Sequence, residues 1–213
     1  MGYAQRTSLA PEGDIRELTL ADLPLFQSHL LRLSPASRRD RFNGFTDDVF
    51  VSAYAARCFS SDATVLAFVV DGTIRGAAEL HVCRPGNRDA AEIAFSVEDA
   101  LQHRGVGAAL FASLVARARA MGCTTLHVTT HAQNGAMKAL ARKFGASLCF
   151  QSVEAVGVID LCKALPPVAT VLVDDPARAA AFPENPGSLC FSDGEATRQE
   201  GCEGRCGASA KSG

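Results

Sequence analysis

Two glycines and an arginine lie in a short polar segment between Val97, which ends an apolar stretch, and the amphipathic stretch that follows. The segment reads Gln102-His103-Arg104-Gly105-Val106-Gly107. The N-terminus of a helix carries unpaired N–H groups and a partial positive charge, and glycines let that backbone approach a phosphate closely. Arg104 adds a permanent positive charge. The spacing therefore predicts a phosphate-binding turn, with a glycine-rich helix start that binds no ligand as the alternative.

This turn differs from two well-known phosphate-binding motifs. No third glycine follows at the spacing of the dinucleotide-binding fingerprint, and the Gly-Lys-Ser/Thr of a P-loop is absent from the sequence. The two glycines alone therefore do not identify the ligand. The order of the elements around them is needed to identify it.

Histidines and cysteines are the other residues that could move a proton or hold a metal. His127 and His131 are four residues apart in a predicted strand and the loop after it, so their side chains would share a face. A proton relay, a metal site and a purely structural role all fit them. Five cysteines are scattered singly beside apolar positions, which favours buried free thiols in a reduced compartment. Cys202 and Cys206 lack a second pair, so we expect no metal site.

The chain up to Leu161 alternates segments with strand and helix patterns. Apolar, β-branched runs predict strands at about residues 15–18, 64–70, 73–83, 90–97, 124–130, 147–152 and 155–161. The capping box at Thr19 predicts a helix after it, and further helices are predicted to begin near residues 37, 47, 105 and 134. In the helix that begins near residue 105, apolar residues recur at spacings of three and four. Gly122 and Gly145 are expected to end the last two helices. We therefore expect an α/β (α+β) fold, with an antiparallel meander of three strands over residues 64–97.

Composition limits the classes of function. The 213 residues carry a formal net charge of -2 and a pI near 6.2, which argues against a nucleic-acid partner. No apolar run approaches the roughly 20 residues that span a membrane. No apolar stretch of signal-peptide type occurs before Asp14. We therefore expect a cytoplasmic protein with no membrane partner, and a monomer or a homodimer.

The composition changes near Leu165, where proline, glycine and acidic residues become frequent. Such a segment cannot bury enough apolar surface to offset the entropy cost of ordering it. We expect a leader over residues 1–13, a folded domain over residues 14–163 and a low-complexity, largely disordered tail over residues 164–213. The stretch from Val168 to Val173 could add one strand.

Taken with this element order, the turn resembles the hallmark of the GNAT superfamily of acyl-CoA N-acyltransferases. That hallmark, Gln/Arg-x-x-Gly-x-Gly/Ala, stands here as Gln102-x-x-Gly105-x-Gly107. A second family element is matched by Asn134 and the helix after it. The resemblance covers about Asp14 to Leu161. It implies a GNAT-type twisted, mostly antiparallel sheet flanked by helices, and a domain over residues 14–163 that uses acetyl-CoA as co-substrate.

Two further segments are similar to the protein-acetyltransferase branch, whose members modify lysines of acyl-CoA synthetases. They are Leu33-Ser34-x-x-Ser37-Arg38-x-x-Arg41-Phe42 and Ala91-Glu92-Ile93-Ala94. The three arginines Arg38, Arg39 and Arg41 suggest a basic lip for an acidic partner, and a solvated helix face is the alternative.

The resemblance also implies the roles of the cofactor-binding residues. The backbone of Phe95, Ser96 and Val97 would pair with the pantetheine arm. The pyrophosphate would lie on the turn, formed by Gln102, His103, Arg104, Gly105, Val106, Gly107 and Ala108. Asn134 would contact the arm near its amide groups, and a helix N-cap is the alternative for its side chain.

The same resemblance implies direct attack of a substrate amine on the thioester. A lysine-type amine has a pKa of about 10.4 and must lose a proton, for which Glu92 is the candidate general base. Its apolar neighbours would raise its pKa by desolvation, and Glu79 is the reserve. Many family members use a tyrosine seven residues after the asparagine as general acid. Here that position is Ala141, and the only tyrosines are Tyr3 and Tyr54.

We therefore expect an N-acetyltransferase that transfers an acetyl group from acetyl-CoA to a primary amine, on a protein lysine or a small molecule. A catalytically weak acyl-CoA-binding sensor or interaction module is the alternative, favoured by the missing tyrosine and the added tail. A nucleotide-binding fold of another kind is a third hypothesis.

Overall fold

The computed structural model describes residues 12–59, 63–84, 87–151 and 153–163, all of which belong to one unit of the chain, residues 1–174. Several expectations lie outside the described residues: most of the predicted leader, the tail from residue 164 with its possible strand, Tyr3, and the pair Cys202 and Cys206. Within the described residues, no helix is both long enough and apolar enough to cross a membrane.

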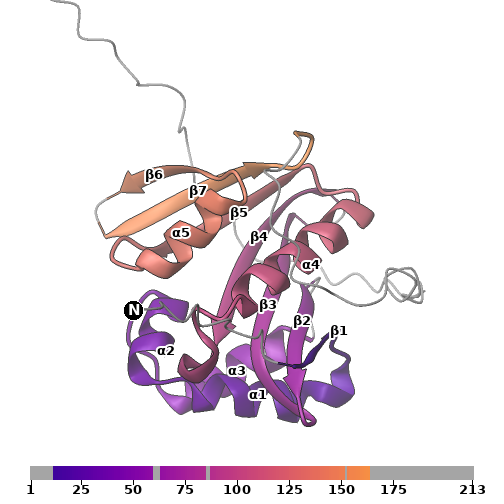
Figure 1. The fold of residues 1–213 in the computed structure, drawn as a ribbon, viewed down its shortest axis with the longest axis vertical. Coiled ribbons are helices and arrows are strands. Elements are labelled where there is room, and N and C mark those ends of the chain that lie inside the picture. Colours follow the sequence, from indigo (N-terminus) through magenta and orange to yellow (C-terminus); the bar gives the residue numbers. More distant parts are fainter. Residues whose placement is uncertain (1–11, 60–62, 85–86, 152, 164–213) are drawn as a thin grey trace, which may run out of the picture. The chain divides into compact units, whose positions relative to one another are not determined.

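The described residues form one seven-stranded sheet with the order β1-β2-β3-β4-β5-β7-β6 (Figure 1). Neighbouring strands are antiparallel except β4 and β5, which are parallel. This confirms the predicted mixed, mostly antiparallel sheet. The strands are β1 (Asp14–Glu17), β2 (Ala63–Val70), β3 (Thr73–Arg84), β4 (Asn87–Val97), β5 (Thr125–His131), β6 (Ser147–Gln151) and β7 (Glu154–Asp160).

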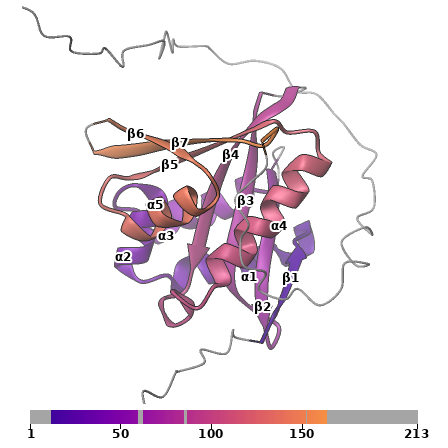
Figure 2. The same cartoon turned by 45° about the horizontal axis from the view of Figure 1, so that its top comes forward.

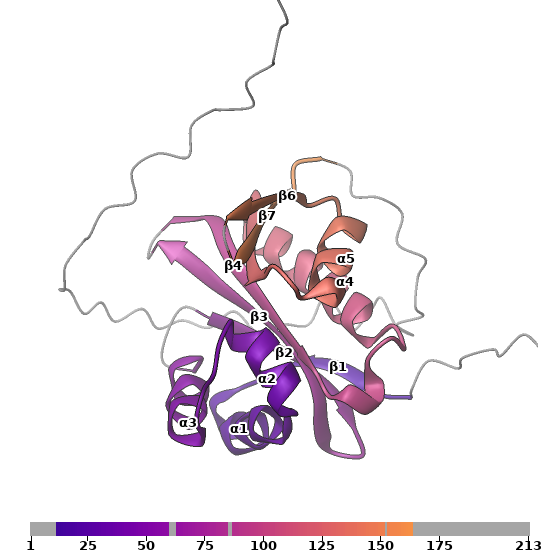
Figure 3. The same ribbon diagram turned by 90° about the vertical axis from the view of Figure 1, so that its left-hand side faces the viewer.

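Five α-helices in the described residues flank this sheet, with α1 to α3 on one face and α4 and α5 on the other (Figure 3). Two short 3-10 turns, Leu20–Asp22 and Asp99–Leu101, precede α1 and α4. The helices are α1 (Leu23–Arg32), α2 (Pro35–Phe42), α3 (Asp48–Arg57), α4 (Val106–Ala120) and α5 (Gly135–Lys143).

Side chains that alternate along the strands supply two separate cores. In β3, Ala77 packs with α1 and α3, whereas Ala78 and Leu80 pack with α4. The larger core contains Phe111 of α4, and the smaller one contains Phe26 of α1. Both faces of β3 are therefore packed against helices, which fixes this strand in the middle of the domain.

The parallel pairing between β4 and β5 is short. Residues Ala90 to Glu92 pair with residues Thr125 to His127, while β5 pairs with β7 over its whole length. Figure 2 shows the β5-β7-β6 part of the sheet turning away from β2, β3 and β4. From Ile93 to Val97, the edge of β4 that faces β5 therefore has no partner strand among the described residues. Unpaired backbone N–H and C=O groups of this kind can bind an extended ligand.

The predicted helix ends agree with the structure, and two other boundaries differ. Gly122 and Gly145 have φ values of 86° and 80°, as expected of glycines that end helices. The capping box at Thr19 is present, but it begins the 3-10 turn and not α1 itself. Strand β3 continues to Arg84, strand β4 begins at Asn87, and these two residues pair with each other. The hairpin between the two strands is therefore tighter than predicted.

Candidate active site

A cleft of about 1240 Å³ follows the open edge of β4. Residues of α2, α3, β3, β4, β5, α5 and β7 line it, together with the turn before α4. This volume exceeds that of a typical small-molecule pocket, so the cleft can hold two ligands at once. One end contains the glycine turn, and the other contains Glu92, His81 and Tyr54.

The glycine turn enters α4 through a left-handed residue. Gly105 is the N-cap of α4 with φ of 88°, where a side chain would be strained, and no side chain caps the helix. The first N–H groups of α4 therefore stay available to an anion. At Gly107, an added Cβ would lie 3.5 Å from Leu140 Cδ2, which is an ordinary contact. The protein's own packing therefore does not require glycine at position 107.

The side chains of the turn do not all face the cleft. Gln102, His103, Gly105, Gly107 and Ala108 line it. Val106 is buried in the core and can offer only its backbone, and Arg104 is exposed without lining the cleft.

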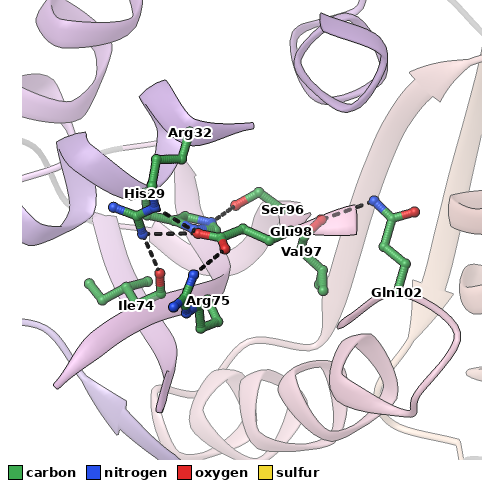
Figure 4. Close-up of polar contacts among 8 residues, drawn as sticks. All are labelled: His29, Arg32, Ile74, Arg75, Ser96, Val97, Glu98 and Gln102. Atoms are coloured by element: carbon green, nitrogen blue, oxygen red, sulfur yellow. Dashed lines mark hydrogen bonds and ion pairs between the residues drawn. The ribbon is translucent and has the colours of Figure 1, made fainter. Parts of the chain in front are cut away.

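Gln102 braces the turn from within. Its Nε2 donates to the carbonyl oxygen of Val97 (Figure 4) and to Ser37 Oγ, both at 3.0 Å. The Ser37 hydroxyl in turn donates to Asp99 at 2.6 Å. These bonds tie the turn to the end of β4 and to α2. In this structure the Gln102 amide nitrogen therefore supports the turn's shape, and the backbone N–H groups are left to meet phosphate.

The three residues predicted to pair with pantetheine all line the cleft on β4. The Phe95 ring stacks on Phe111 of α4, with 4.9 Å between ring centroids, and Ser96 is buried. Their side chains are used in packing, which leaves the backbone edge for a ligand, as the sequence predicted. Asn134 also lines the cleft, and its Oδ1 accepts from the N–H of Met137 at 2.9 Å as an N-cap. Its side chain therefore has the capping role that was the alternative.

A partly buried carboxylate, Glu98, anchors the end of β4 (Figure 4). Glu98 accepts from Arg32 at 2.9 Å, from Arg75 at 2.9 Å and from His29 Nδ1 at 3.4 Å. Burial tends to raise the pKa of Glu98, but the hydrogen bonds from His29, Arg75 and Arg32 outweigh it and lower the pKa to about 2. These interactions join α1 and β3 to Glu98, which lies between the end of β4 and the glycine turn. Sequence reasoning missed this cluster, because its members are far apart in the chain.

Ser96, His29 and Glu98 have the order of a serine-hydrolase triad. His29 Nε2 lies 2.9 Å from Ser96 Oγ, and its Nδ1 faces Glu98. A nucleophile has to reach its substrate, however, and His29 is fully buried while Ser96 is 5% exposed. The arrangement therefore holds α1 against β4 and does not offer a nucleophile to the cleft.

Glu92 lies at the opposite end of the cleft from the turn. It lines the cleft, as a general base would have to. It is exposed, so the expectation that apolar neighbours desolvate it is wrong. The reason is that Glu92 lines the open cleft, so its side chain reaches solvent. Glu92 makes no hydrogen bond or ion pair with another described residue.

Glu79, the reserve base, is fully buried within a cluster of donors. Its Oε2 accepts from Arg41 at 2.8 Å, from His81 Nε2 at 3.1 Å and from the hydroxyl of Tyr54, with the thiol of Cys58 at 3.6 Å. Burial tends to raise the pKa of Glu79, but the charge of Arg41 and the hydrogen bond from His81 outweigh it and hold the pKa well below its usual range. A carboxylate stabilised in this way is a weak proton acceptor, so an orienting role suits Glu79 better.

The arginines of α2 do not form the expected basic lip. The side chain of Arg41 is 8% exposed and is paired with Glu79. Arg38 is paired with Asp48 at 2.6 Å and is 16% exposed, whereas Arg39 is 60% exposed. A solvated helix face does not describe Arg38 and Arg41 either, because both attach α2 to the rest of the domain.

Among the predicted histidines, only His103 lines the cleft. His127 sits opposite Glu92 in the parallel pairing, and His131 accepts from the N–H of Gln133 at 3.2 Å. Neither lines the cleft. His81, which the sequence analysis did not consider, does line it, because its strand neighbours Glu92.

The cysteine expectation holds in part. Cys58 and Cys123 are buried, as expected, while Cys83, Cys149 and Cys162 are exposed. The ligand atoms of Cys58, Glu79 and His81 lie within 4.8 Å of one another, which is close enough for a metal ion. The guanidinium of Arg41 already neutralises Glu79, however, so a cation placed there would be repelled.

The position of the family's tyrosine is occupied by a core residue. Ala141 is 1% exposed and packs in the larger core. The structure instead brings Tyr54 of α3 to the cleft, where it donates to Glu79. Burial, followed by the charge of Glu79, raises the pKa of Tyr54 well above its usual range. Sequence spacing could not reveal this, since Tyr54 lies 87 positions before Ala141 and on another element.

Comparisons with known proteins agree with this geometry. Residues 30–146, more than half of the chain, match the model of the acetyltransferase (GNAT) family. The chain therefore belongs to the GNAT acetyltransferase family. A search of curated proteins found no match.

Solved structures with the same fold include the GNAT domain of S. lividans PAT, with a TM-score of 0.61 and 22% identity over 70% of this chain and 90% of that one. The yncA structure from Salmonella typhimurium, with its cofactor acetyl-CoA, has a TM-score of 0.53 and 19% identity over 75% and 100% of the two chains. The paia N-acetyltransferase from Thermoplasma acidophilum, in complex with coenzyme A, has a TM-score of 0.55 and 15% identity over 70% and 99%.

Proposed function

We propose that this protein transfers an acetyl group from acetyl-CoA to a primary amine in a ternary complex, through a domain that spans residues 14–163. The observation that carries the proposal is the open edge of β4, which ends at the glycine turn before α4. Family membership supports acyltransferase activity in general. The yncA and paia structures, which contain acetyl-CoA and coenzyme A, support this donor in particular.

Binding of the donor follows from the two parts of the cleft. The backbone of Phe95, Ser96 and Val97 would pair with the amide groups of the pantetheine arm as an added strand does. The pyrophosphate would lie at the N-terminus of α4, where Gly105 and Gly107 leave room for it. The thioester would then be directed towards Glu92.

At that end of the cleft, Glu92 would bind the incoming ammonium and take its first proton. At neutral pH a lysine-type amine is about 99.9% protonated, so this step has to precede attack. An exposed carboxylate can pass the proton to solvent. The neutral amine then attacks the thioester carbonyl, the C–N bond forms, and the bond to sulfur breaks.

A protein lysine is the acceptor that we favour. The support is the similarity of the Leu33 to Phe42 and Ala91 to Ala94 segments to the protein-acetyltransferase branch, and the fold shared with S. lividans PAT. The cleft is open, as a side chain presented by another protein requires. Small amines are the other acceptors to be tested.

The test is turnover of acetyl-CoA with a panel of small amines and with lysine-bearing proteins, including acyl-CoA synthetases. We expect free thiol and N-acetylated product in equal amounts, with the product located by mass spectrometry. Absence of acetylated product with every acceptor would overturn the proposal. In a parallel thermal scan, acetyl-CoA should raise Tm, whereas a rise with mononucleotides alone would favour a nucleotide-binding protein.

The alternative function is an acyl-CoA-binding sensor with little activity. It is favoured by Ala141, which removes the tyrosine that many family members use to protonate the leaving thiolate. Tight calorimetric binding of acetyl-CoA, combined with no turnover on any acceptor, would support the sensor.

A further inference from the structure

His81 lies beside the buried carboxylate of Glu79, at the end of the cleft that also contains Glu92. Its Nε2 lies 3.1 Å from Glu79 Oε2, and it is the direct partner of Glu92 in the pairing of β3 with β4. We propose that His81 is a further catalytic residue, which carries a proton from the attacking amine nitrogen to the departing CoA sulfur. This inference rests on the proposed function.

The strand geometry places the three side chains on one face of the sheet. Glu79 and His81 are two residues apart in β3, and successive side chains of a strand alternate between faces. Residues directly opposite in neighbouring strands share a face as well, with Cβ atoms about 5 Å apart. Glu79, His81 and Glu92 therefore form a row that runs from the interior to the cleft. Their exposure increases in the same order, from 0% for Glu79 through 31% for the His81 side chain to the exposed Glu92.

Glu79 determines which nitrogen of His81 carries the proton. Arg41 keeps Glu79 ionised, and an ionised carboxylate can only accept hydrogen bonds. The Nε2 of His81 must therefore donate, which leaves the lone pair on Nδ1 in the neutral ring. A buried carboxylate that fixes the tautomer of a histidine is the arrangement by which serine proteases prepare their base.

The Nδ1 atom is free to act. No described residue forms a hydrogen bond with it, and the His81 side chain lines the cleft. The groups that face the ring are Glu79 beside it, Glu92 on β4, Tyr54 and Cys58 on α3, and Arg41 on α2. The Glu79 carboxylate lies beside the ring, and Arg41 is held by Glu79.

The protons of the reaction balance with two acceptors. The ammonium loses its first proton to Glu92, and the resulting amine attacks the carbonyl carbon. The new C–N bond leaves a second proton on nitrogen, which moves to His81 Nδ1. When the C–S bond breaks, Nδ1 returns that proton to sulfur, so the products are the amide and neutral CoA thiol. His81 would thus do what the tyrosine absent from position 141 does elsewhere in the family.

The variant that isolates this role is His81→Gln, whose amide can still donate to Glu79 but has no basic nitrogen. We expect kcat on the best acceptor to fall by about 100-fold or more, as it does on loss of an acid–base group, with little change in KM for acetyl-CoA. His131→Gln is the matched control, because His131 lies outside the cleft lining, and it should keep the wild-type rate. Tm and calorimetric acetyl-CoA binding verify that each variant is folded.

Two readouts separate catalysis from a structural role. The acidic limb of the wild-type pH profile of kcat should change in His81→Gln and persist in Glu92→Gln. In His81→Ala, which leaves a space open to the cleft, added imidazole should restore formation of the acetylated amine, whereas it should not do so in His81→Gln. Glu79→Gln should shift the profile without abolishing turnover, since Glu79 acts through His81 as a positioning residue.

The possible failures are distinct. A wild-type protein with no turnover on any amine overturns both the proposed function and this inference. Wild-type turnover with His81→Gln within threefold of its kcat overturns only the inference. A loss of kcat with an unchanged pH profile and no imidazole rescue assigns His81 a structural role, which also overturns it.

Discussion

Arg41 Nη2 lies 2.8 Å from Glu79 Oε2, and the two side chains are 8% and 0% exposed. This ion pair joins α2 to β3 at the end of the cleft that contains Glu92, His81 and Tyr54, which we call the acceptor end. Arg41 also donates to Tyr54, so the pair fixes three elements around the candidate site. A pair this deeply buried is costly to break, because the remaining charge has no water to solvate it.

Arg41→Gln should therefore destabilise the domain by about 3–5 kcal/mol, measured as the free energy of unfolding in urea. The double variant Arg41→Gln/Glu79→Gln should recover part of that loss, because no uncompensated charge stays buried. Arg39→Gln is the control, since Arg39 is 60% exposed and should change stability by less than about 0.5 kcal/mol. Equal effects of the two single arginine substitutions would contradict the ion pair.

The Glu98 cluster predicts how stability depends on pH. The pKa of Glu98 is lowered to about 2 in the folded protein, compared with about 4.3 in an unfolded chain. Its contribution is therefore complete above the unfolded value and is lost as the pH falls from about 5 to about 2. We expect the free energy of unfolding to fall less steeply over this range in Glu98→Gln than in the wild type, by about 1–3 kcal/mol. Identical slopes would show that Glu98 is not held in its ionised form.

Local patterns predicted the elements well, because they depend on residues close in sequence. The positive-φ glycines Gly122 and Gly145 end their helices as expected, since only a few residues decide such a cap. The meander of β2, β3 and β4 followed from apolar runs separated by turn residues. The glycine turn was found because both its elements and its glycines lie within one short stretch.

The acceptor end of the cleft could not be predicted in the same way. Tyr54 and His81 contact Glu79 only because β3 packs against α3. Their spacing in the sequence does not predict this contact. Burial is equally non-local: Glu92 in β4 is exposed, while Glu79, which also lies in a largely apolar strand, is fully buried. A search for polar residues two apart on a buried strand could have pointed to Glu79 and His81 as a pair.

Gln102 provides a test of how the turn is held. Replacing it by alanine removes the hydrogen bonds to Val97 and Ser37 but leaves the backbone N–H groups of α4 in place. Because each such bond contributes about 0.5–1.5 kcal/mol, we expect Gln102→Ala to weaken acetyl-CoA binding by about 3–30-fold. Calorimetry measures the Kd, and Gln133→Ala, outside the cleft, is the control. Unchanged affinity in Gln102→Ala would mean that the turn keeps its shape without the hydrogen bonds of Gln102.

Gly107 distinguishes a cofactor requirement from a folding requirement. An added Cβ would lie 3.5 Å from Leu140 and would clash with nothing in the protein, so Gly107→Ala should fold with a Tm close to that of the wild type. The same methyl group would stand where the pyrophosphate approaches the backbone, and we expect acetyl-CoA affinity to fall about 10-fold or more. Gly44→Ala is the matched control, because its Cβ would meet no atom within 4 Å and it does not line the cleft. A Gly107→Ala protein with normal affinity would place the pyrophosphate elsewhere.

Glu92 is the residue on which the chemical proposal depends most directly. Because Glu92 is exposed and has no partner among the described residues, Glu92→Gln should leave Tm and acetyl-CoA binding unchanged. The rate at saturating substrate should nevertheless fall by about 100-fold or more, since the ammonium loses its proton acceptor. Raising the pH towards the pKa of the amine should recover part of the rate, because the free amine then forms without a base. A Glu92→Gln protein with full activity at neutral pH would remove Glu92 from the mechanism and leave His81 as the base to be tested.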